Sequence, residues 1–206
     1  MSRYFNYFPK LISSQNNSAQ IVTNIIARVE ELNSLKNNSL VYYQYSIQES
    51  DTPEIIADKY YGDPEKHWII LLTNDIQDPF FDWPMPYQIF ADYVENKYLP
   101  MANTMAGQTG TAWAQSNIQA YQKVISSTDA ASGNTTVRTY SVDANTYNTI
   151  VSQTITTALN TVKIDKSTLS YYDYEVNLNE SKRTIFLLNS SYVDQIMNEL
   201  ITLMGQ

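Results

Sequence analysis

Two helix-start signals follow one another closely in the first half of the chain, and they constrain the local architecture strongly. Residues 51–54 read Asp-Thr-Pro-Glu, in which threonine can cap a helix, proline suits the first helical position and glutamate complements the helix dipole. Gly62 is placed to end that helix in a left-handed conformation, and residues 63–65, Asp-Pro-Glu, repeat the signal at once. Residues 41–47 are β-branched and aromatic, so the pattern predicts strand, helix, tight turn, helix.

The composition of the 206 residues excludes most common catalytic sites. The chain has no cysteine and one histidine, His67, which excludes disulfide scaffolds, thiolate zinc sites and the HExxH arrangement. None of the five glycines forms a nucleotide-binding loop. His67 lacks a serine nucleophile context, so a structural or solvated role is favoured. We therefore expect no catalytic residues, no metal site, no cofactor and no enzymatic activity.

Four carboxylates around the predicted helices could suggest a glycosidase pair, but local roles explain them better. Asp51 and Asp63 suit turns and caps, and Asp58 and Glu65 suit a solvated face. The net charge of −8, with no cluster of Lys or Arg, argues against nucleic acid as a partner. The longest uncharged stretch, 101–122, is rich in Gln, Asn and Thr, and no secretory signal is apparent. We expect no membrane partner and synthesis in a cytoplasm.

The remaining pattern predicts an α+β protein that ends in an amphipathic helix. Expected helices cover 19–35, with Ser18 as N-cap, and 87–98; residues 101–136 form a polar insertion or loop with a short helix over about 113–124. Expected strands are 137–142, 161–164, 171–176 and 183–188. The predicted divisions are an aromatic arm and helix (1–40), a strand–helix–helix module with a Pro/aromatic extension and helix (41–100), the polar insertion (101–145), and a strand-rich segment with the C-terminal helix (146–206).

The stretch 45–79 resembles a LysM module. The matching residues include Tyr45-Ser46-Ile47, Asp51-Thr52, Tyr60-Tyr61-Gly62, Trp68 and Asn74-Asp75-Ile76-Gln77-Asp78-Pro79. The resemblance implies a β-α-α-β fold, although no closing strand follows Pro79, where a Phe-Phe-Asp-Trp-Pro run stands instead. It also implies binding of N-acetylglucosamine glycans such as peptidoglycan or chitin, with candidate contacts at Asp51, Thr52, Asn74, Ile76 and Asp78.

The order of motifs along the whole chain resembles the small LysM-containing wedge subunits of contractile-tailed phage baseplates. An aromatic N-terminal arm, the LysM-like unit, the Phe-Phe-Asp-Trp-Pro run, the strand 183–188 and the final amphipathic helix occur in that order. The resemblance implies a structural protein of the virion tail baseplate that joins wedge subunits and neighbouring wedges in a sixfold assembly. Glycan binding is the alternative function, and peptidoglycan is a doubtful partner under the first one.

Aromatic and aliphatic clusters are the candidate partner interfaces. The N-terminal aromatics suit either a docking element or folding back on the core, and the C-terminal stripe suits either the chain's own core or a partner subunit. For the aromatics among prolines, core and interface are equally open. The candidates are Tyr4, Phe5, Tyr7, Phe8, Phe80, Phe81, Trp83, Tyr192, Ile196 and Leu200.

Overall fold

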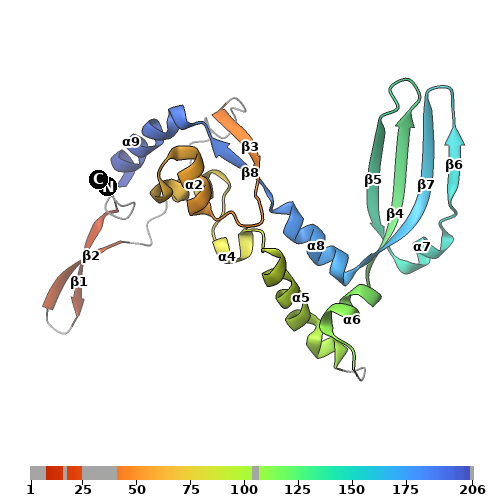
Figure 1. Ribbon diagram of the computed structural model, residues 1–206, viewed down its shortest axis with the longest axis horizontal. Helices are drawn as coiled ribbons and strands as arrows, with labels where there is room; N and C mark the ends of the chain where they lie inside the picture. Colours follow the sequence, from red (N-terminus) through yellow and green to blue (C-terminus); the bar gives the residue numbers. More distant parts are fainter. Residues whose placement is uncertain (1–7, 16–17, 25–40, 104–106, 205–206) are drawn as a thin grey trace. The chain divides into compact units, whose positions relative to one another are not determined.

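The computed structural model describes residues 8–15, 18–24, 41–103 and 107–204 (Figure 1). The chain divides into two compact units. Unit 1 comprises Met1–Pro84 together with Glu180–Gln206, and unit 2 comprises Met85–Asn179. Unit 1 is therefore discontinuous in sequence, with unit 2 inserted into it. The mixed helix and sheet content confirms the α+β fold class.

Unit 1 contains the strand–helix–helix order that the capping signals predict. Strand β3 (Tyr42–Ser46) precedes α2 (Pro53–Tyr61), the short 3-10 helix η3 (Pro64–Lys66) and α3 (His67–Thr73). The hydroxyl of Thr52 accepts a hydrogen bond from the N–H of Ile55, and Gly62 ends α2 with φ +68°. Asp63 caps η3 in the same way, through the N–H of Glu65. The two short helices are thus set by local side-chain chemistry.

The strand that closes this unit comes from the far end of the chain. Strand β8 (Thr184–Leu188) pairs antiparallel with β3, in a register that runs from Tyr42 opposite Leu188 to Ser46 opposite Thr184. The expected strand 183–188 is confirmed. Its pairing supplies the β-α-α-β order that residues directly after Pro79 do not.

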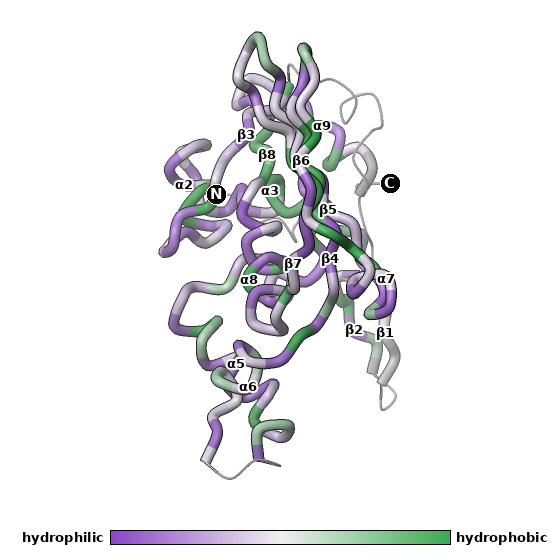
Figure 2. Tube along the Cα trace, turned by 90° about the vertical axis from the view of Figure 1, so that its right-hand side faces the viewer, coloured by the Kyte–Doolittle hydropathy of each residue, from purple (hydrophilic) through white to green (hydrophobic). Residues whose placement is uncertain are grey.

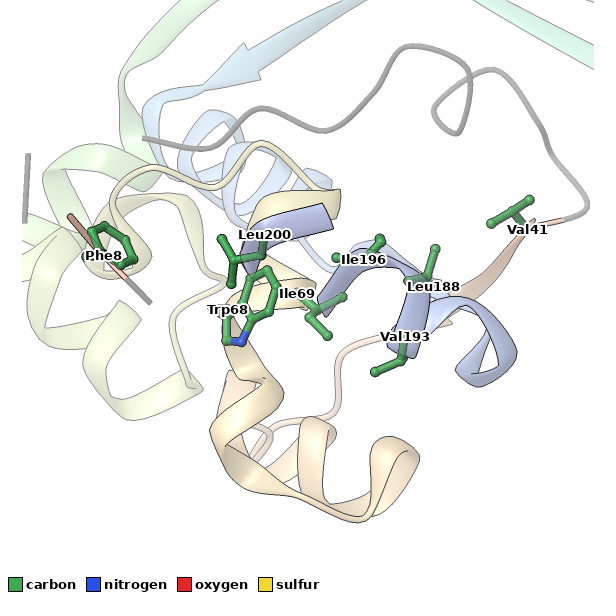
Figure 3. Packing of buried hydrophobic residues seen from close by; sticks show 8 residues of the cluster. All are labelled: Phe8, Val41, Trp68, Ile69, Leu188, Val193, Ile196 and Leu200. Atoms are coloured by element: carbon green, nitrogen blue, oxygen red, sulfur yellow. The ribbon is translucent and has the colours of Figure 1, made fainter. Parts of the chain in front are cut away.

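The core of unit 1 consists of two apolar clusters. One lies between the helices and the β3–β8 pair, and its buried members are Ile47, Ile56, Ala57, Ile70, Trp83, Ile185 and Leu187. The other packs α9 (Val193–Met204) against α3, as Figure 3 shows for Trp68, Ile69, Ile196 and Leu200. Segments α3 and β8 are correspondingly among the green, hydrophobic stretches of Figure 2. The C-terminal stripe therefore packs on the chain's own core.

A β-hairpin replaces the start of the expected helix 19–35. Strands β1 (Lys10–Gln15) and β2 (Ser18–Thr23) pair antiparallel, with Ile12 opposite Ile21. The helix prediction is wrong for residues 19–24, because β-branched Ile21 and Val22 suit a strand and find a partner only a few residues away. The remainder of that predicted helix, residues 25–35, lies outside the described residues.

The helices of unit 2 surround a small aromatic core. Helix α5 (Tyr87–Ala102) packs with α6 (Gly110–Ser116) and α8 (Tyr171–Ser181), whose last two residues belong to unit 1. Phe90, Val94, Tyr98 and Ala114 are buried there, and the ring of Tyr98 stacks on that of Trp113 at 5.7 Å. The expected helix 87–98 is confirmed and extends one turn further.

A four-stranded antiparallel sheet forms the rest of unit 2 (Figure 1). Its order is β5-β4-β7-β6, and its members are β4 (Ile118–Asp129), β5 (Thr135–Val142), β6 (Gln153–Thr156) and β7 (Asn160–Ser170). A short helix, α7 (Ala144–Thr149), lies between β5 and β6 in sequence. The expected strands 137–142 and 161–164 are confirmed within β5 and β7.

Two other predictions for unit 2 are wrong. Residues 118–129 form a strand and not a loop or a helix, because their Ser, Thr and Gln side chains sit on an open sheet that does not need an apolar face. Residues 171–176 are helical and not a strand. The Ser170 hydroxyl accepts a hydrogen bond from the N–H of Asp173, and Tyr171, Tyr172 and Val176 pack into the aromatic core. Tertiary packing thus overrides the β propensity of the tyrosines there.

We predict that Gly110→Ala destabilises unit 2 by about 2 kcal/mol, because an added methyl group overpacks the contact between α5 and α6. A Cβ at Gly110 would lie 2.1 Å from the carbonyl oxygen of Glu95 in α5. Denaturant unfolding followed by circular dichroism measures the change. Gly107→Ala is the control: its Cβ meets open space, so only the cost of φ +81° remains, about 1 kcal/mol. Equal losses in the two variants would contradict the packing argument.

Candidate functional site

A single helical turn in unit 1 presents two phenylalanines to solvent. Helix α4 (Pro79–Asp82) begins with proline at its first position, and the Asp78 carboxylate caps it by accepting a hydrogen bond from the N–H of Phe80 at 3.0 Å. Asp82 closes the turn, with its carboxylate accepting from the backbone of Gln77 and Asp78. Phe80 is 88% exposed and Phe81 66% exposed. Exposed aromatic side chains on a rigid turn are typical of docking surfaces.

Two contacts tie this turn to the rest of unit 1. Trp83, directly after the turn, is buried, and its indole N–H donates to the carbonyl oxygen of Asp51 at 3.0 Å. On the other side the Lys182 ammonium donates to the carbonyl oxygen of Phe81. The turn is therefore held from both sides by residues distant in sequence.

A cleft of about 530 Å³ adjoins the phenylalanine turn. Its walls come from the segment after α3 and from the outer edge of β8, and both Asp82 and Lys182 contribute to it. The lining residues are Thr73, Asn74, Asp75, Ile76, Asp82, Lys182, Thr184, Ile185 and Phe186. We refer to the cleft together with Phe80 and Phe81 as the aromatic cleft.

Asn74 fixes one wall of the aromatic cleft. Its amide N–H group donates to the carbonyl oxygen of Phe186 at 2.8 Å, and its amide oxygen accepts from the N–H of Phe186 at 2.8 Å. The same amide also donates to the carbonyl oxygen of Ile70. Asn74 thus satisfies the outward-facing peptide groups of β8 much as another strand would. No hydrogen-bond partner is found for the buried Thr73 hydroxyl oxygen among the described residues.

A buried carboxylate beneath the site stiffens the loop before α2. The side chain of Asp51 is 0% exposed and accepts hydrogen bonds from the hydroxyl of Tyr45 and the ammonium of Lys59, both at 2.7 Å, and from the N–H of Gln48. Burial opposes ionisation of Asp51, but these donors outweigh it and lower the pKa of the carboxyl below its ordinary value. The hydrogen bond to that carboxylate, with burial, raises the pKa of Tyr45 to about 12.

The five candidate glycan-contact residues have structural partners or lie in loops. Asp51 is buried in its hydrogen-bond network, and the Asn74 amide is engaged with β8. Thr52 and Asp78 cap α2 and α4. Ile76 is partly buried against the apolar cluster between the helices and the β3–β8 pair, and it also lines the aromatic cleft. Only Asn74 and Ile76 of the five therefore border the cleft.

The candidate interface residues fall into four groups. Phe80 and Phe81 are exposed, so they are available to a partner. Tyr192 is partly buried, and a set of four is buried within unit 1. The buried four are Phe8, Trp83, Ile196 and Leu200. Tyr4, Phe5 and Tyr7 lie outside the described residues.

One feature of the site and one network in unit 2 were not predicted from sequence. The contribution of Thr184–Leu188 to the cleft depends on a pairing across the whole of unit 2. In unit 2, the buried Glu175 accepts hydrogen bonds from the hydroxyl of Tyr98 and the ammonium of Lys97, both at 2.7 Å. A single Glu in a Tyr-rich segment is the only sequence signal for that network. Burial, and then the hydrogen bond to the Glu175 carboxylate, raise the pKa of Tyr98.

Among the described residues, the single histidine makes a local contact and no metal-binding group occurs. His67 lies near the carbonyl oxygen of Pro64, with Nδ1 at 3.0 Å, and no serine nucleophile contacts it in that part of the chain. No group of three or more His, Asp or Glu side chains that could hold a metal ion occurs among the described residues. Of the helices that the structure describes, none is long and apolar enough to span a bilayer.

Comparison with known proteins identifies the family. The family model of base plate wedge protein 53 matches residues 4–203, which is nearly the whole chain. The chain belongs to the base plate wedge protein 53 family. It is also similar to baseplate wedge protein gp53 of Enterobacteria phage T4, with 41% identity over 39 residues. That match covers 19% of this chain and 20% of the phage T4 protein.

Membership of this family confirms three predictions. The family is a structural family of the phage tail baseplate and not an enzyme family. The expected non-enzymatic, structural role and the expected location in the virion tail baseplate are therefore confirmed. A baseplate wedge component must contact other baseplate components, so exposed surfaces of the two units are candidate interfaces.

We predict that Asp51→Asn destabilises unit 1 by about 2 kcal/mol at pH 7, because three donors lose a charged acceptor in a buried position. The Asp51 carboxyl has a lowered folded pKa, so its stabilisation is complete above the ordinary Asp pKa of about 3.9 and is lost as pH falls through the folded value. Denaturant unfolding at a series of pH values should therefore show wild type and variant converging below about pH 4.

Tyr45→Phe is the matched control for this prediction. It removes one hydroxyl and leaves the carboxylate with its other two donors, so the expected loss is about 1 kcal/mol. The raised pKa of Tyr45, about 12, means that the hydroxyl contributes below pH 10 and loses its contribution as pH rises toward 12. A constant difference between wild type and Asp51→Asn from pH 7 to pH 3 would contradict the assignment.

Proposed function

We propose that this protein joins baseplate wedge subunits to one another in a sixfold assembly, and that the aromatic cleft is one of its joining surfaces. The observation that carries the proposal is the rigid exposure of Phe80 and Phe81 beside a cleft in a chain of a baseplate wedge family. Two large aromatic side chains next to a concave surface provide the desolvated centre that protein interfaces require.

The anchoring of the phenylalanine turn supports a docking role. A capped turn held by Trp83 and Lys182 loses little conformational freedom when a partner binds, so more of the interaction energy appears as affinity. Asn74 already satisfies the peptide groups of Phe186 on the strand edge. A partner segment therefore meets an ordered, largely satisfied wall, which favours side-chain insertion over strand addition.

We further propose that the β3-α2-α3-β8 module is LysM-like in fold and serves as a structural adaptor. The order of its elements and the antiparallel β3–β8 pair support this assignment. The Asp51 and Asn74 side chains take part in internal hydrogen bonds, so these two groups stabilise the module itself. Under this proposal, neighbouring wedges are its partners and no nucleic acid or membrane is required.

We predict that Phe80→Ala with Phe81→Ala weakens binding to the other wedge subunits of the same virion by about 30-fold or more, as expected for hot-spot aromatics. Because both side chains are mostly exposed, the free energy of unfolding should change little. Co-sedimentation of the purified chain with purified wedge subunits gives the affinity. Leu159→Ala is the control, since Leu159 is 75% exposed and lies outside unit 1. Unaltered binding in the double variant would exclude the aromatic cleft as a joining surface.

The alternative function is binding of N-acetylglucosamine glycans, and the position of the cleft beside residues 73–76 is the observation that favours it. A pelleting assay against insoluble peptidoglycan and chitin, with a LysM protein as positive control, separates the two functions. The adaptor proposal predicts no retention that soluble N-acetylglucosamine oligomers can compete away. Competable retention that is lost in Ile76→Ala would support the alternative.

A further inference from the structure

One face of the four-stranded sheet in unit 2 carries three cationic side chains. Side chains alternate between the two faces of a strand, so the register places Lys123, Arg138 and Lys166 on the same face. Lys123 lies directly opposite Lys166 on the neighbouring strand β7, and Arg138 lies opposite Ile125, the next residue of that face along β4. We call this surface the basic face.

None of these three cations has an ion-pair partner among the described residues. The Lys166 ammonium lies 4.8 Å from the centre of the Tyr147 ring. Among the described residues, the Lys166 ammonium has no other contact with a charged or aromatic side chain. Like charges directly opposite on a sheet are destabilising. The opposite face of the same sheet differs, since Lys163 there pairs with Asp165 at 3.1 Å. The unpaired charges are therefore confined to the basic face.

Aliphatic side chains adjoin the cations on this face. Ile125 lies opposite Ile164, and Ile155 of the edge strand β6 lies opposite Val162. No side chain of the four strands is fully buried, and Figure 1 shows them side by side. The basic face is thus positively charged and partly apolar, with the ring of Tyr147 in α7 packed on Tyr121 of the same face at 4.8 Å, in a chain whose net charge is −8.

Helix α2 in unit 1 carries the complementary pattern. Glu54 and Asp58 are exposed, lie one helical turn apart, and have no ion-pair partner among the described residues. Ile55 beside them is 40% exposed. Side chains at this helical spacing have Cβ atoms about 5–6 Å apart, and cross-strand pairs such as Lys123 and Lys166 about 4.5–5.5 Å. The Cβ atoms of the acidic pair and of the Lys123–Lys166 pair therefore have similar separations, and the two pairs carry opposite charges.

We infer that the basic face of one copy binds helix α2 of a second copy, with Glu54 and Asp58 against Lys123 and Lys166 and with Ile55 against Ile125 and Ile164. Different surfaces meet in this contact, so it is heterologous and repeats from copy to copy into a ring or a chain. The inference rests on the proposed function and names a second copy as one of the neighbours that are joined. Exposed ion pairs are individually weak, so free chains associate weakly and a repeating assembly strengthens the contact.

Sedimentation velocity on two charge-reversed variants tests the inference. Lys123→Glu with Lys166→Glu reverses the basic face, and Glu54→Lys with Asp58→Lys reverses the helix. Wild type should show a sedimentation coefficient that rises with concentration at low salt and loses the rise at high salt. Each variant alone should associate about tenfold or more weakly, because like charges then meet at the contact. An equimolar mixture of the two variants should regain association, since each then offers the other a complementary surface.

The effect of net charge distinguishes the proposed contact from non-specific association. The Glu54/Asp58 variant moves the net charge of −8 toward zero, so association limited by general repulsion would increase in it, whereas the inference predicts a decrease. Asp92→Lys is the control, because Asp92 is an exposed helical carboxylate outside the proposed contact, and it should associate as wild type does. Circular dichroism confirms that each variant is folded.

The inference would be overturned by a wild-type chain that stays monomeric at every concentration and salt, by association that neither reversal weakens, or by a mixture that fails to regain association. If the sedimentation coefficients of wild type and variants differ by an amount that does not depend on concentration, α2 binds the basic face of its own chain. That outcome also overturns the inference. Binding of wedge subunits by a chain that does not self-associate would leave the proposed function intact. Phe80→Ala with Phe81→Ala should self-associate like wild type, so the two surfaces are tested separately.

Discussion

The antiparallel pairing of β3 with β8 joins two stretches of chain that are separated by the whole of unit 2. Ile185 and Leu187 of β8 complete the apolar cluster under α2 and α3, and Leu188 reaches the second cluster under α9. The outward peptide groups of β8 hold the Asn74 amide, and the hydroxyl of Tyr61 donates to the carbonyl oxygen of Leu188. Both cores of unit 1 and one wall of the aromatic cleft depend on this one strand.

The chain passes between the two units twice, at residues 84–85 and 179–180, and these two points are adjacent. Insertion of unit 2 is therefore compatible with the pairing of β3 and β8. The side chain of Asn179 accepts a hydrogen bond from the N–H of Met85 at 2.7 Å and donates to its carbonyl oxygen at 3.1 Å. The chain thus leaves and re-enters unit 1 at neighbouring points, as domain insertions generally do. A module of this kind can present a second unit with surfaces of its own, and the open sheet of unit 2 is such a surface.

Helices and strands could be predicted from the sequence wherever a capping residue or a strong hydrophobic periodicity determines the local structure. The caps at Thr52 and Asp63, the glycine at 62 and the C-terminal stripe each predicted an element that the structure contains. The aromatic run around Phe80 was also identified as either core or interface, and the structure divides it, with Trp83 inside and the phenylalanines outside.

Long-range pairing was not readable in the same way. The strand 183–188 was expected, but nothing in its own residues shows that it pairs with Tyr42–Ser46 and closes the helical module. The polar strand β4 escaped prediction because Ser, Thr and Gln on both faces remove the apolar alternation that marks a half-buried strand. Helix α8 was missed because its tyrosines favour strands in isolation and become helical by packing against Phe90 and Tyr98.

The most direct test of this account is to remove unit 2 and ask whether unit 1 still forms. Residues 85–179 would be replaced by a short Gly/Ser linker between Pro84 and Glu180, and amide hydrogen exchange would be followed across β3 and β8. The account predicts that the paired amides of the two strands remain protected, because their partners, both apolar clusters and the Asn74 contact are all retained. Rapid exchange throughout both strands, in a chain that remains monodisperse, would contradict the claim that β8 closes unit 1 independently of the inserted unit.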